Sequence, residues 1–187
     1  MRADHSAPLR LDSQGWLGSP AVRRPSPNFD ARPPGAAVDL VVVHAISLPP
    51  EEFGGSGVEC LFTNSLNADE HPYYAEIAGL RVSAHFFIRR DGELIQFVST
   101  EDRAWHAGVS CWRGRERCND FSVGIELEGC DTVPFEPAQY ERLCELIAAI
   151  RARYPSVRDV VGHSDIAPGR KTDPGPCFDW TQLRRVV

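Results

Sequence analysis

Residues 39–47 read DLVVVHAIS and form the first clear strand of the chain. The unbroken apolar run at 40–43 is typical of a strand that is buried on both faces. Pro49 and Pro50 follow and end it, since proline cannot donate to a sheet. His44 lies at the end of the run, where strands lead into loops and functional sites are often built. A structural histidine satisfied by hydrogen bonds is the alternative interpretation of His44.

A second strand is predicted at residues 121–129, FSVGIELEG, which alternate with a period of two. The apolar set is expected to face the core: Phe121, Val123, Ile125 and Leu127. The other set is expected on the opposite face: Ser122, Gly124, Glu126 and Glu128. A charged side chain such as Glu126, in a strand that is otherwise expected to be buried, needs an interaction partner or a functional role. Gly124 beside it leaves room for a substrate or another backbone.

The longest predicted helix covers residues 137–154. Its apolar stripe follows helical spacing: Tyr140, Leu143, Ile147 and Ile150. Pro137 suits the first turn of this helix, and Pro155 stops it. Residues 85–99 predict a hairpin with a tight primed turn at Asp91-Gly92.

Shorter elements complete the pattern. We expect a helix at 72–80, a strand at 157–161 and a last helix at 180–187, capped by Asp179. Strands therefore alternate with helices, which predicts an α/β fold. The length favours a single domain, over residues 16–187, after a polar tail at 1–15 that we expect to be mobile.

Composition excludes several classes of function. The net charge of −6 and the lack of a basic run argue against a nucleic-acid partner. No window approaches the roughly 18 apolar residues of a membrane span, and the N-terminal sequence has no apolar segment typical of a secretory signal. The six cysteines include no C-x-x-C pair, so we expect reduced thiols, a cytoplasmic protein and no cysteine-based zinc site.

The stretch at 161–176, VGHSDIAPGRKTDPGP, holds the most concentrated polar chemistry. His163, Lys171 and Asp173 lie in one loop whose prolines and glycines can fold it back on itself. His163 and Asp173, together with His44, make a set of two histidines and one carboxylate. Catalytic zinc commonly has three protein ligands and one open position. The alternative interpretation is a surface loop with a capping histidine and a solvated lysine and aspartate.

Each of these residue types answers a need of amide hydrolysis. Zinc polarises a carbonyl and lowers the pKa of bound water from about 15.7 towards 7. Glu126 is then a candidate general base, which takes a proton from that water and returns it to the leaving amine. Lys171 is a candidate for stabilising the oxyanion.

Other chemistries explain less of the sequence. A glycosidase could use Glu126 and Glu128, about 7 Å apart along one strand face, but this leaves the 161–176 loop unexplained. No cysteine has a histidine context that suggests a nucleophile. His85 is expected to be structural. Trp105 and His106 either pack internally or form a wall of a cleft.

Five stretches together resemble a known family. They are VVVHAISLPP (41–50), LRVSAHFFIRRDGELIQFV (80–98), RAWHAGVS (103–110), GRERCNDFSVGIELEG (114–129) and GHSDIAPGRKTDPGP (162–176). The chain is identified by them as a member of the type-2 N-acetylmuramoyl-L-alanine amidase and peptidoglycan-recognition-protein superfamily. The resemblance implies a central mixed β-sheet flanked by helices and one catalytic zinc ion.

The resemblance also implies roles for individual residues. It makes His44, His163 and Asp173 the zinc ligands, Glu126 the catalytic carboxylate and Lys171 the residue that stabilises the transition state. A further set is implied to bind substrate: Arg81 and Arg117 through carboxylates of the stem peptide, and Trp105 and Tyr73 as the lining of the cleft. The family's usual asparagine after the first histidine is Ala45 here, so any substrate contact of that amide is missing.

The implied reaction is hydrolysis of the lactyl–L-alanine amide of 1,6-anhydro-N-acetylmuramyl peptides. Its context is cytoplasmic cell-wall recycling, which also keeps AmpC β-lactamase induction low in bacteria with that circuit. We expect a monomer whose partner is this small muropeptide, with neither nucleic acid nor membrane involved. Two alternatives stay open: a periplasmic or lytic amidase on intact peptidoglycan, and a module that binds peptidoglycan without cleaving it.

Overall fold

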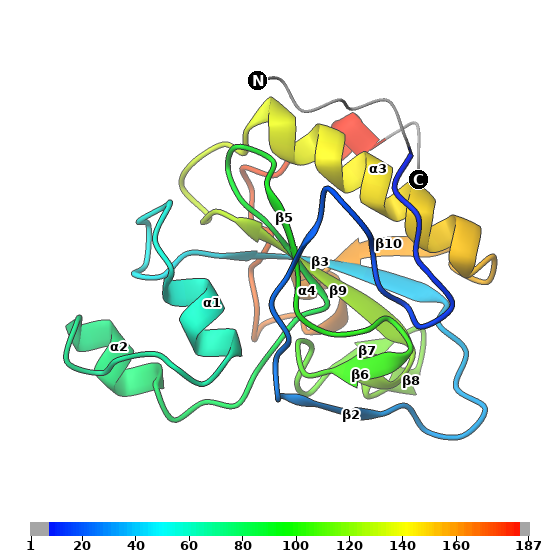
Figure 1. Cartoon of the computed structure of the whole chain (residues 1–187), viewed down its shortest axis with the longest axis horizontal. Helices are drawn as coiled ribbons and strands as arrows, with labels where there is room; N and C mark the ends of the chain where they lie inside the picture. Colours follow the sequence, from blue (N-terminus) through cyan, green and yellow to red (C-terminus); the bar gives the residue numbers. More distant parts are fainter. Residues whose placement is uncertain (1–7, 184–187) are drawn as a thin grey trace.

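A six-stranded mixed sheet is the centre of the computed structural model, which describes residues 8–183 (Figure 1). Its strands lie in the order β1 (Val22–Arg23), β5 (Leu94–Gln96), β4 (Phe86–Ile88), β9 (Ser122–Glu128), β3 (Leu40–Ile46) and β10 (Asp159–Gly162). The β4–β5 pair is antiparallel, and the other neighbours are parallel. The expected α/β fold with a central mixed sheet is confirmed.

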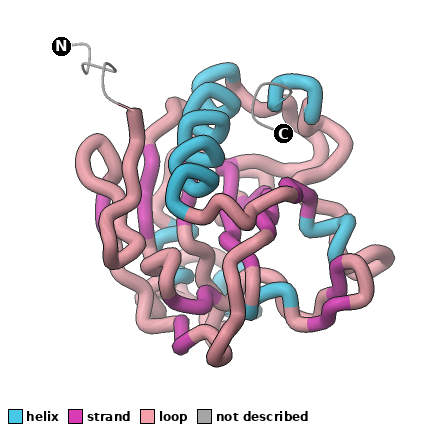
Figure 2. The backbone as a smooth tube through the Cα atoms, turned by 90° about the vertical axis from the view of Figure 1, so that its right-hand side faces the viewer, coloured by secondary structure: helices cyan, strands magenta, loops and turns pink. Residues whose placement is uncertain are grey.

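Smaller elements surround this sheet. Two short ribbons pair β2 (Phe29–Ala31) with β6 (Asp102–Ala104) and β7 (Cys111–Trp112) with β8 (Arg115–Glu116). The helices are α1 (Gly57–Phe62), α2 (Pro72–Ile77), α3 (Pro137–Arg153) and α4 (His163–Ile166), with 3₁₀ turns at Cys118–Asp120 and Trp180–Leu183. Much of the remaining backbone is loop (Figure 2). Within residues 8–183, no helix has the length and apolar character needed to cross a membrane.

Helix α3 covers one face of the sheet (Figure 1). Its predicted stripe is buried, and Leu146 extends it. These side chains pack against alternate residues of the central strands, among them Val41, Val43 and Ile125. The helix begins with a capping box between Glu136 and Gln139. This face is the main hydrophobic core.

The opposite face carries two separate apolar clusters. One surrounds Phe87 and Ile95 beneath α1 and α2, and the other surrounds Leu40 and Val42 beside α4. Phe121 belongs to the second of these, so its predicted place with Val123 on the α3 side is wrong, because it precedes the regular strand. On this face of β3, His44 lies between Val42 of the second cluster and Ile46, which packs against the first.

Part of the predicted mobile tail packs on the domain. Leu9 is only 9% exposed, and Leu11 forms an isolated bridge with Leu17. The expectation of a mobile tail is therefore wrong for residues 8–15, whose leucines find apolar surface. Residues 1–7 lie outside the described part of the chain.

Three local predictions also need correction. The hairpin at β4–β5 forms, but only Gly92 in its turn has a positive φ, and the Gly92 amide donates to the Arg89 carbonyl. A three-residue turn therefore replaces the primed one, which would need two positive φ angles. Residues 180–183 form a 3₁₀ turn instead of an α-helix, and 184–187 lie outside the described residues. The 161–176 loop contains one helical turn, α4.

Candidate metal centre

Three neighbouring parallel strands deliver polar side chains to one edge of the sheet. His44 on β3 lies directly opposite Glu126 on β9. Gly162 at the end of β10 lies opposite Val43, so His163 follows beside His44. Side chains at the carboxyl ends of parallel strands meet at such an edge, where α/β proteins commonly build their sites.

Asp173 reaches the same place from the loop after α4. The amide of Ser164 donates to the Asp173 carbonyl at 2.9 Å, and the amide of Lys171 donates to the Ala167 carbonyl at 3.1 Å. Gly162 has no side chain, and a Cβ there would lie 2.8 Å from Cδ of Pro174. The loop therefore folds closely over the end of β10 and turns Asp173 back towards His163.

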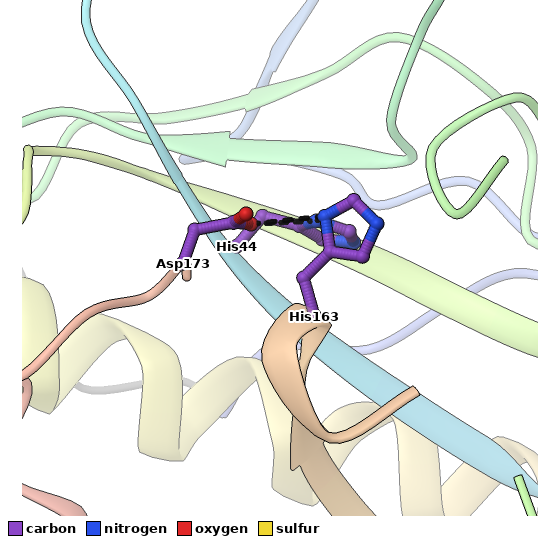
Figure 3. A group of neighbouring side chains, drawn as sticks. All are labelled: His44, His163 and Asp173. Atoms are coloured by element: carbon purple, nitrogen blue, oxygen red, sulfur yellow. Dashed lines mark hydrogen bonds and ion pairs between the residues drawn. The ribbon is translucent and has the colours of Figure 1, made fainter. Parts of the chain in front are cut away.

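Three ligand-type atoms converge in the result (Figure 3). Nδ1 of His44 lies 2.9 Å from Nδ1 of His163, and Oδ2 of Asp173 lies 3.2 Å and 3.1 Å from these two nitrogens. Ligands at the usual zinc–nitrogen distance of about 2.0–2.1 Å are roughly 3.3 Å apart in a tetrahedron. The three atoms therefore have the spacing of a tetrahedral metal site with one open corner.

The protonation of this cluster also suits a cation. Nε2 of His163 faces the carbonyl of Ala107 at 3.2 Å and donates to it, which leaves Nδ1 as the nitrogen that faces His44 and Asp173. Burial lowers the pKa of His44 to about 4, which favours its neutral ring. Burial alone would raise the pKa of Asp173, but its contacts with His163 and His44 outweigh burial and hold that pKa below its usual value. Two ring nitrogens and a carboxylate oxygen, all atoms that can bind a metal ion, thus lie close together.

Glu126 stands beside this cluster as a free carboxylate. It is 8% exposed, and within the described residues its Oε2 has no hydrogen-bond partner. Burial, followed by the negative charge of Asp173, raises the pKa of Glu126 well above its usual value, against the opposing effect of Lys171. A carboxylate of raised pKa is a stronger base than an ordinary one, which suits a group that accepts a proton and later returns it.

The centre opens into a cleft of about 500 Å³. One wall is apolar and comes mainly from α1, α2 and the segments around them: Leu61, Phe62, Tyr73, Ile77, Leu80, Val82 and Trp105. The other wall is polar and includes Lys171, Thr172 and Arg170. The cleft is thus suited to a molecule with one apolar and one polar side.

The predicted substrate-binding residues divide into two groups. Tyr73 and Trp105 line the cleft, as expected. Arg81 is exposed and donates to the carbonyls of Ala78 and Leu80, while Arg117 is exposed and pairs with Asp120 at 3.3 Å. Neither arginine is among the residues that line the cleft.

His106 fills the space predicted to be open above Gly124. A Cβ on Gly124 would lie 2.5 Å from the His106 ring, so an imidazole takes the place expected for substrate or backbone. The ring is buried and also borders the cleft, so it combines the two interpretations that the sequence left open. Pairing a glycine with a ring from a distant loop has no signal in the local sequence.

Two further residues clarify the site. Arg170 was missed from sequence, and its Nη2 donates at 2.7 Å to the carbonyls of both Ala107 and Val109. Glu128 accepts from the amides of Gly54 and Arg90 at 2.5 Å and 3.0 Å. It is outside the lining of the cleft, so the structure does not support a pair of catalytic carboxylates.

Comparisons with known proteins agree with this geometry. Residues 34–176 match the family described as N-acetylmuramoyl-L-alanine amidase. The chain is 56% identical to 1,6-anhydro-N-acetylmuramyl-L-alanine amidase AmpD of Escherichia coli strain K12, over 95% of this chain and 97% of that protein. A crystal structure of a selenomethionine AmpD derivative superposes with a TM-score of 0.91 at 56% identity, covering 95% of this chain and 98% of that one. A complex of Escherichia coli AmiD with anhydro-N-acetylmuramic acid-L-Ala-D-γ-Glu-L-Lys has a TM-score of 0.58 at 30% identity, covering 95% and 65%.

Proposed function

Since the chain belongs to the N-acetylmuramoyl-L-alanine amidase family, we propose that it uses one zinc ion held by His44, His163 and Asp173. It is an amidase that acts on 1,6-anhydro-N-acetylmuramyl peptides in peptidoglycan recycling, as its 56% identity to AmpD over 95% of the chain shows. The bond hydrolysed joins the lactyl group to L-alanine. One observation supports the metal most strongly: three possible ligand atoms converge beside Glu126, whose buried Oε2 has no hydrogen-bond partner among residues 8–183.

The metal ligands would have a defined role. A bound zinc ion supplies Lewis acidity and lowers the pKa of water towards about 7. His44 and His163 would bind the ion through Nδ1, and Asp173 would add the negative charge. Three ligands leave one position for water or substrate, as in other catalytic zinc sites.

Glu126 and Lys171 would carry the proton and the charge. Glu126 accepts the proton of the attacking water and passes it to the departing L-alanine amine, which suits its raised pKa. Lys171 lines the polar wall, where its ammonium can stabilise the oxyanion formed from the amide carbonyl.

Substrate contacts follow from the two walls. Tyr73 and Trp105 would pack against the apolar parts of the muropeptide. Arg81 and Arg117 would meet carboxylates of the stem peptide from outside the cleft lining, by reorienting their exposed side chains. Ala45 borders the cleft without offering a hydrogen bond.

The cellular setting is part of the proposal. Residues 16–187 would act as a single amidase domain in a monomer, since every proposed catalytic group comes from one chain. Six cysteines that form no disulfide support a reducing, cytoplasmic location. In a bacterium with an inducible AmpC β-lactamase, removal of muropeptides would keep induction low, and gene deletion should raise β-lactamase activity.

A defined anhydro-muropeptide tests the activity. Mass analysis should find free stem peptide and 1,6-anhydro-N-acetylmuramic acid, and a chelator should abolish both products until zinc is restored. Unchanged turnover after complete zinc removal would contradict the metal mechanism. Whole sacculi serve as the comparison substrate, and a marked preference for them would favour a lytic amidase.

Three substitutions separate metal binding from chemistry. His44→Ala should lose the zinc ion, whereas Glu126→Ala and Lys171→Ala should retain it and lose most turnover. Metal analysis of the purified variants measures this directly. Normal zinc content in His44→Ala would remove that residue from the ligand set.

A further inference from the structure

His106 lies directly behind one of the proposed metal ligands. Its Nδ1 is 2.9 Å from Nε2 of His44, the nitrogen that faces away from the metal position. Its Nε2 is 3.2 Å from Oγ of Ser122, and that hydroxyl donates to the carbonyl of Cys118 at 2.6 Å. His44, His106 and Ser122 are all at least nine-tenths buried, and Cys118 has no exposed surface.

The carbonyl at the end of this chain fixes the direction of every hydrogen bond in it. A carbonyl can only accept, so the single proton of the Ser122 hydroxyl is committed to Cys118. Nε2 of His106 must then donate to Ser122. Within residues 8–183, no hydrogen bond or ion pair joins the His106 ring to a carboxylate, so the ring carries its single hydrogen on Nε2 and its Nδ1 is bare.

A bare Nδ1 on His106 accepts the hydrogen from Nε2 of His44. His44 in its neutral form then has its lone pair on Nδ1, the atom that faces His163 and Asp173. The other tautomer of His44 would place a hydrogen in the metal position, between Nδ1 and its neighbours His163 and Asp173.

We propose that His106 is a positioning residue that, with Ser122, fixes Nδ1 of His44 as the metal-binding nitrogen. This inference rests on the proposed zinc site and adds a residue outside its ligand set. A hydrogen bond to the ring nitrogen that does not bind the metal sets the orientation and tautomer of a ligand histidine.

The backbone carbonyl of Ala107, next to His106, fixes the orientation of the other proposed histidine ligand, His163. The carbonyl of Ala107 accepts from Nε2 of His163, which places a hydrogen on that nitrogen and leaves Nδ1 to face the metal position. The amides of His106 and Ala107 both donate to Oδ1 of Asn119, at 3.1 Å and 2.8 Å. One anchored loop thus sets the tautomer of both histidine ligands, one through a side chain and one through a carbonyl.

Gly124 is the structural requirement for this arrangement. The His106 ring lies where a side chain on β9 would otherwise project, between Ser122 and Glu126 on the same face. The sequence pattern Ser-x-Gly-x-Glu at 122–126 therefore has three roles on this face: an acceptor for His106, space for its ring and a carboxylate for catalysis.

Two substitutions at one position test the hydrogen bond. His106→Asn keeps an acceptor near the place of Nδ1, whereas His106→Leu fills the site without one. Zinc affinity, measured by competition with a chromogenic chelator, should fall about 10–100-fold in His106→Leu and much less in His106→Asn. Wild-type zinc affinity in His106→Leu would overturn the inference.

His85 provides a matched control on the same face. It is a fully buried histidine whose ring centroid is 5.8 Å from that of His106, and its nitrogens meet the Gly124 amide and the Asp102 carbonyl. His85→Leu should lower thermal stability but keep zinc affinity within about threefold of wild type. An equal loss of affinity in both leucine variants would show a structural effect only and contradict the positioning role.

The tautomers can be observed without any variant. Two-bond ¹H–¹⁵N spectra of histidine-labelled protein, metal-free and zinc-loaded, should show the hydrogen of His106 on Nε2 in both forms. A hydrogen on Nδ1 of His106 would overturn the inference whether or not zinc binds. If wild type binds no zinc, the proposed metal site fails by a separate measurement.

Discussion

The two faces of strands β3 and β9 are buried to the same extent and built on different chemistry. Val43 is 0% exposed and faces α3, while His44, the next residue, is 1% exposed and faces the cleft. On the α3 face, burial of apolar volume is the main source of stability. On the cleft face, each buried donor needs an acceptor and each buried acceptor needs a donor. The exposed fraction of a side chain therefore does not separate a functional position from a core position, whereas its hydrogen-bond partners do.

Glu126 is the exception on the polar face, and its substitution should have the largest effect. Glu126→Gln keeps shape and burial but removes the base, so kcat should fall about 10²–10⁴-fold. The metal-free variant should be at least as stable as wild type, because a buried ionised carboxylate is costly. Steady-state kinetics and urea unfolding measure the two effects.

Glu128→Gln is the matched control on the same strand and face. Glu128 holds the amides of Gly54 and Arg90 and an ion pair with Arg89 at 3.6 Å. Removal of the Glu128 charge should lower the free energy of unfolding and leave kcat near the wild-type value. Equal activity losses in Glu126→Gln and Glu128→Gln would break the distinction between a catalytic and a structural carboxylate.

Leu146 tests the apolar face. Leu146→Ala removes a fully buried side chain of α3 and should lower the free energy of unfolding by about 2–5 kcal/mol. Folded protein should keep kcat/KM, since no cleft residue is changed. Glu141→Ala, at an exposed position of the same helix, should change stability by less than about 0.5 kcal/mol. A large activity loss in folded Leu146→Ala would show that the faces are coupled.

Acid should destabilise the polar face selectively. Burial, and then the charge of Arg32, lower the pKa of His85 to about 3, from an ordinary value of 6.5. Below pH 6.5 the unfolded chain binds a proton at His85 that the folded protein does not bind. The contribution of neutral His85 to the free energy of unfolding is therefore present above pH 6.5 and is lost as pH falls towards 3.

The size of this acid effect can be measured in metal-free protein. Between pH 7 and pH 5, His85 should account for a loss of about 2 kcal/mol of unfolding free energy. Urea unfolding of wild type and His85→Gln at both pH values tests it. The variant should lose less stability than wild type over this interval, and an equal loss would assign the acid sensitivity to other groups.

Arg81 should show the smallest effect. Its guanidinium is exposed and bound to neighbouring carbonyls, so a contact with a substrate carboxylate is worth about 0.2–1 kcal/mol. Arg81→Ala should therefore raise KM less than about fivefold and leave kcat unchanged. A tenfold or greater rise in KM would show that Arg81 moves into the cleft when substrate binds.

The apolar face of the sheet could be predicted from the sequence more completely than the polar face. The apolar face follows from periodicity, as Val41, Val43 and the α3 stripe illustrate, because each position needs only size and apolar character. The ligand set was also within reach, because His44 ends a strand and His163 and Asp173 share a loop built to turn back. Spacing offered Glu126 and Lys171 as candidates for the base and the cation, and the family resemblance implied their individual roles.

What sequence could not reach depends on direction and on distant pairing. The contact of His106 with Gly124 joins a loop to a strand, and neither segment encodes the other. The roles of Ser122 and the Cys118 carbonyl depend on which atom donates, which no residue pattern records. The packing of Leu9 was missed because a short apolar pair in a polar segment resembles a tail.

Anomalous diffraction at the zinc edge, on crystals of the zinc-loaded protein, tests the division of the polar face into metal ligands and a free base. One anomalous peak should lie within about 2.0–2.2 Å of Nδ1 of His44, Nδ1 of His163 and an oxygen of Asp173. Glu126 should remain outside the coordination sphere. An ion bound through Nε2 of His44 or by Glu126, or no ion at this position, would contradict that division.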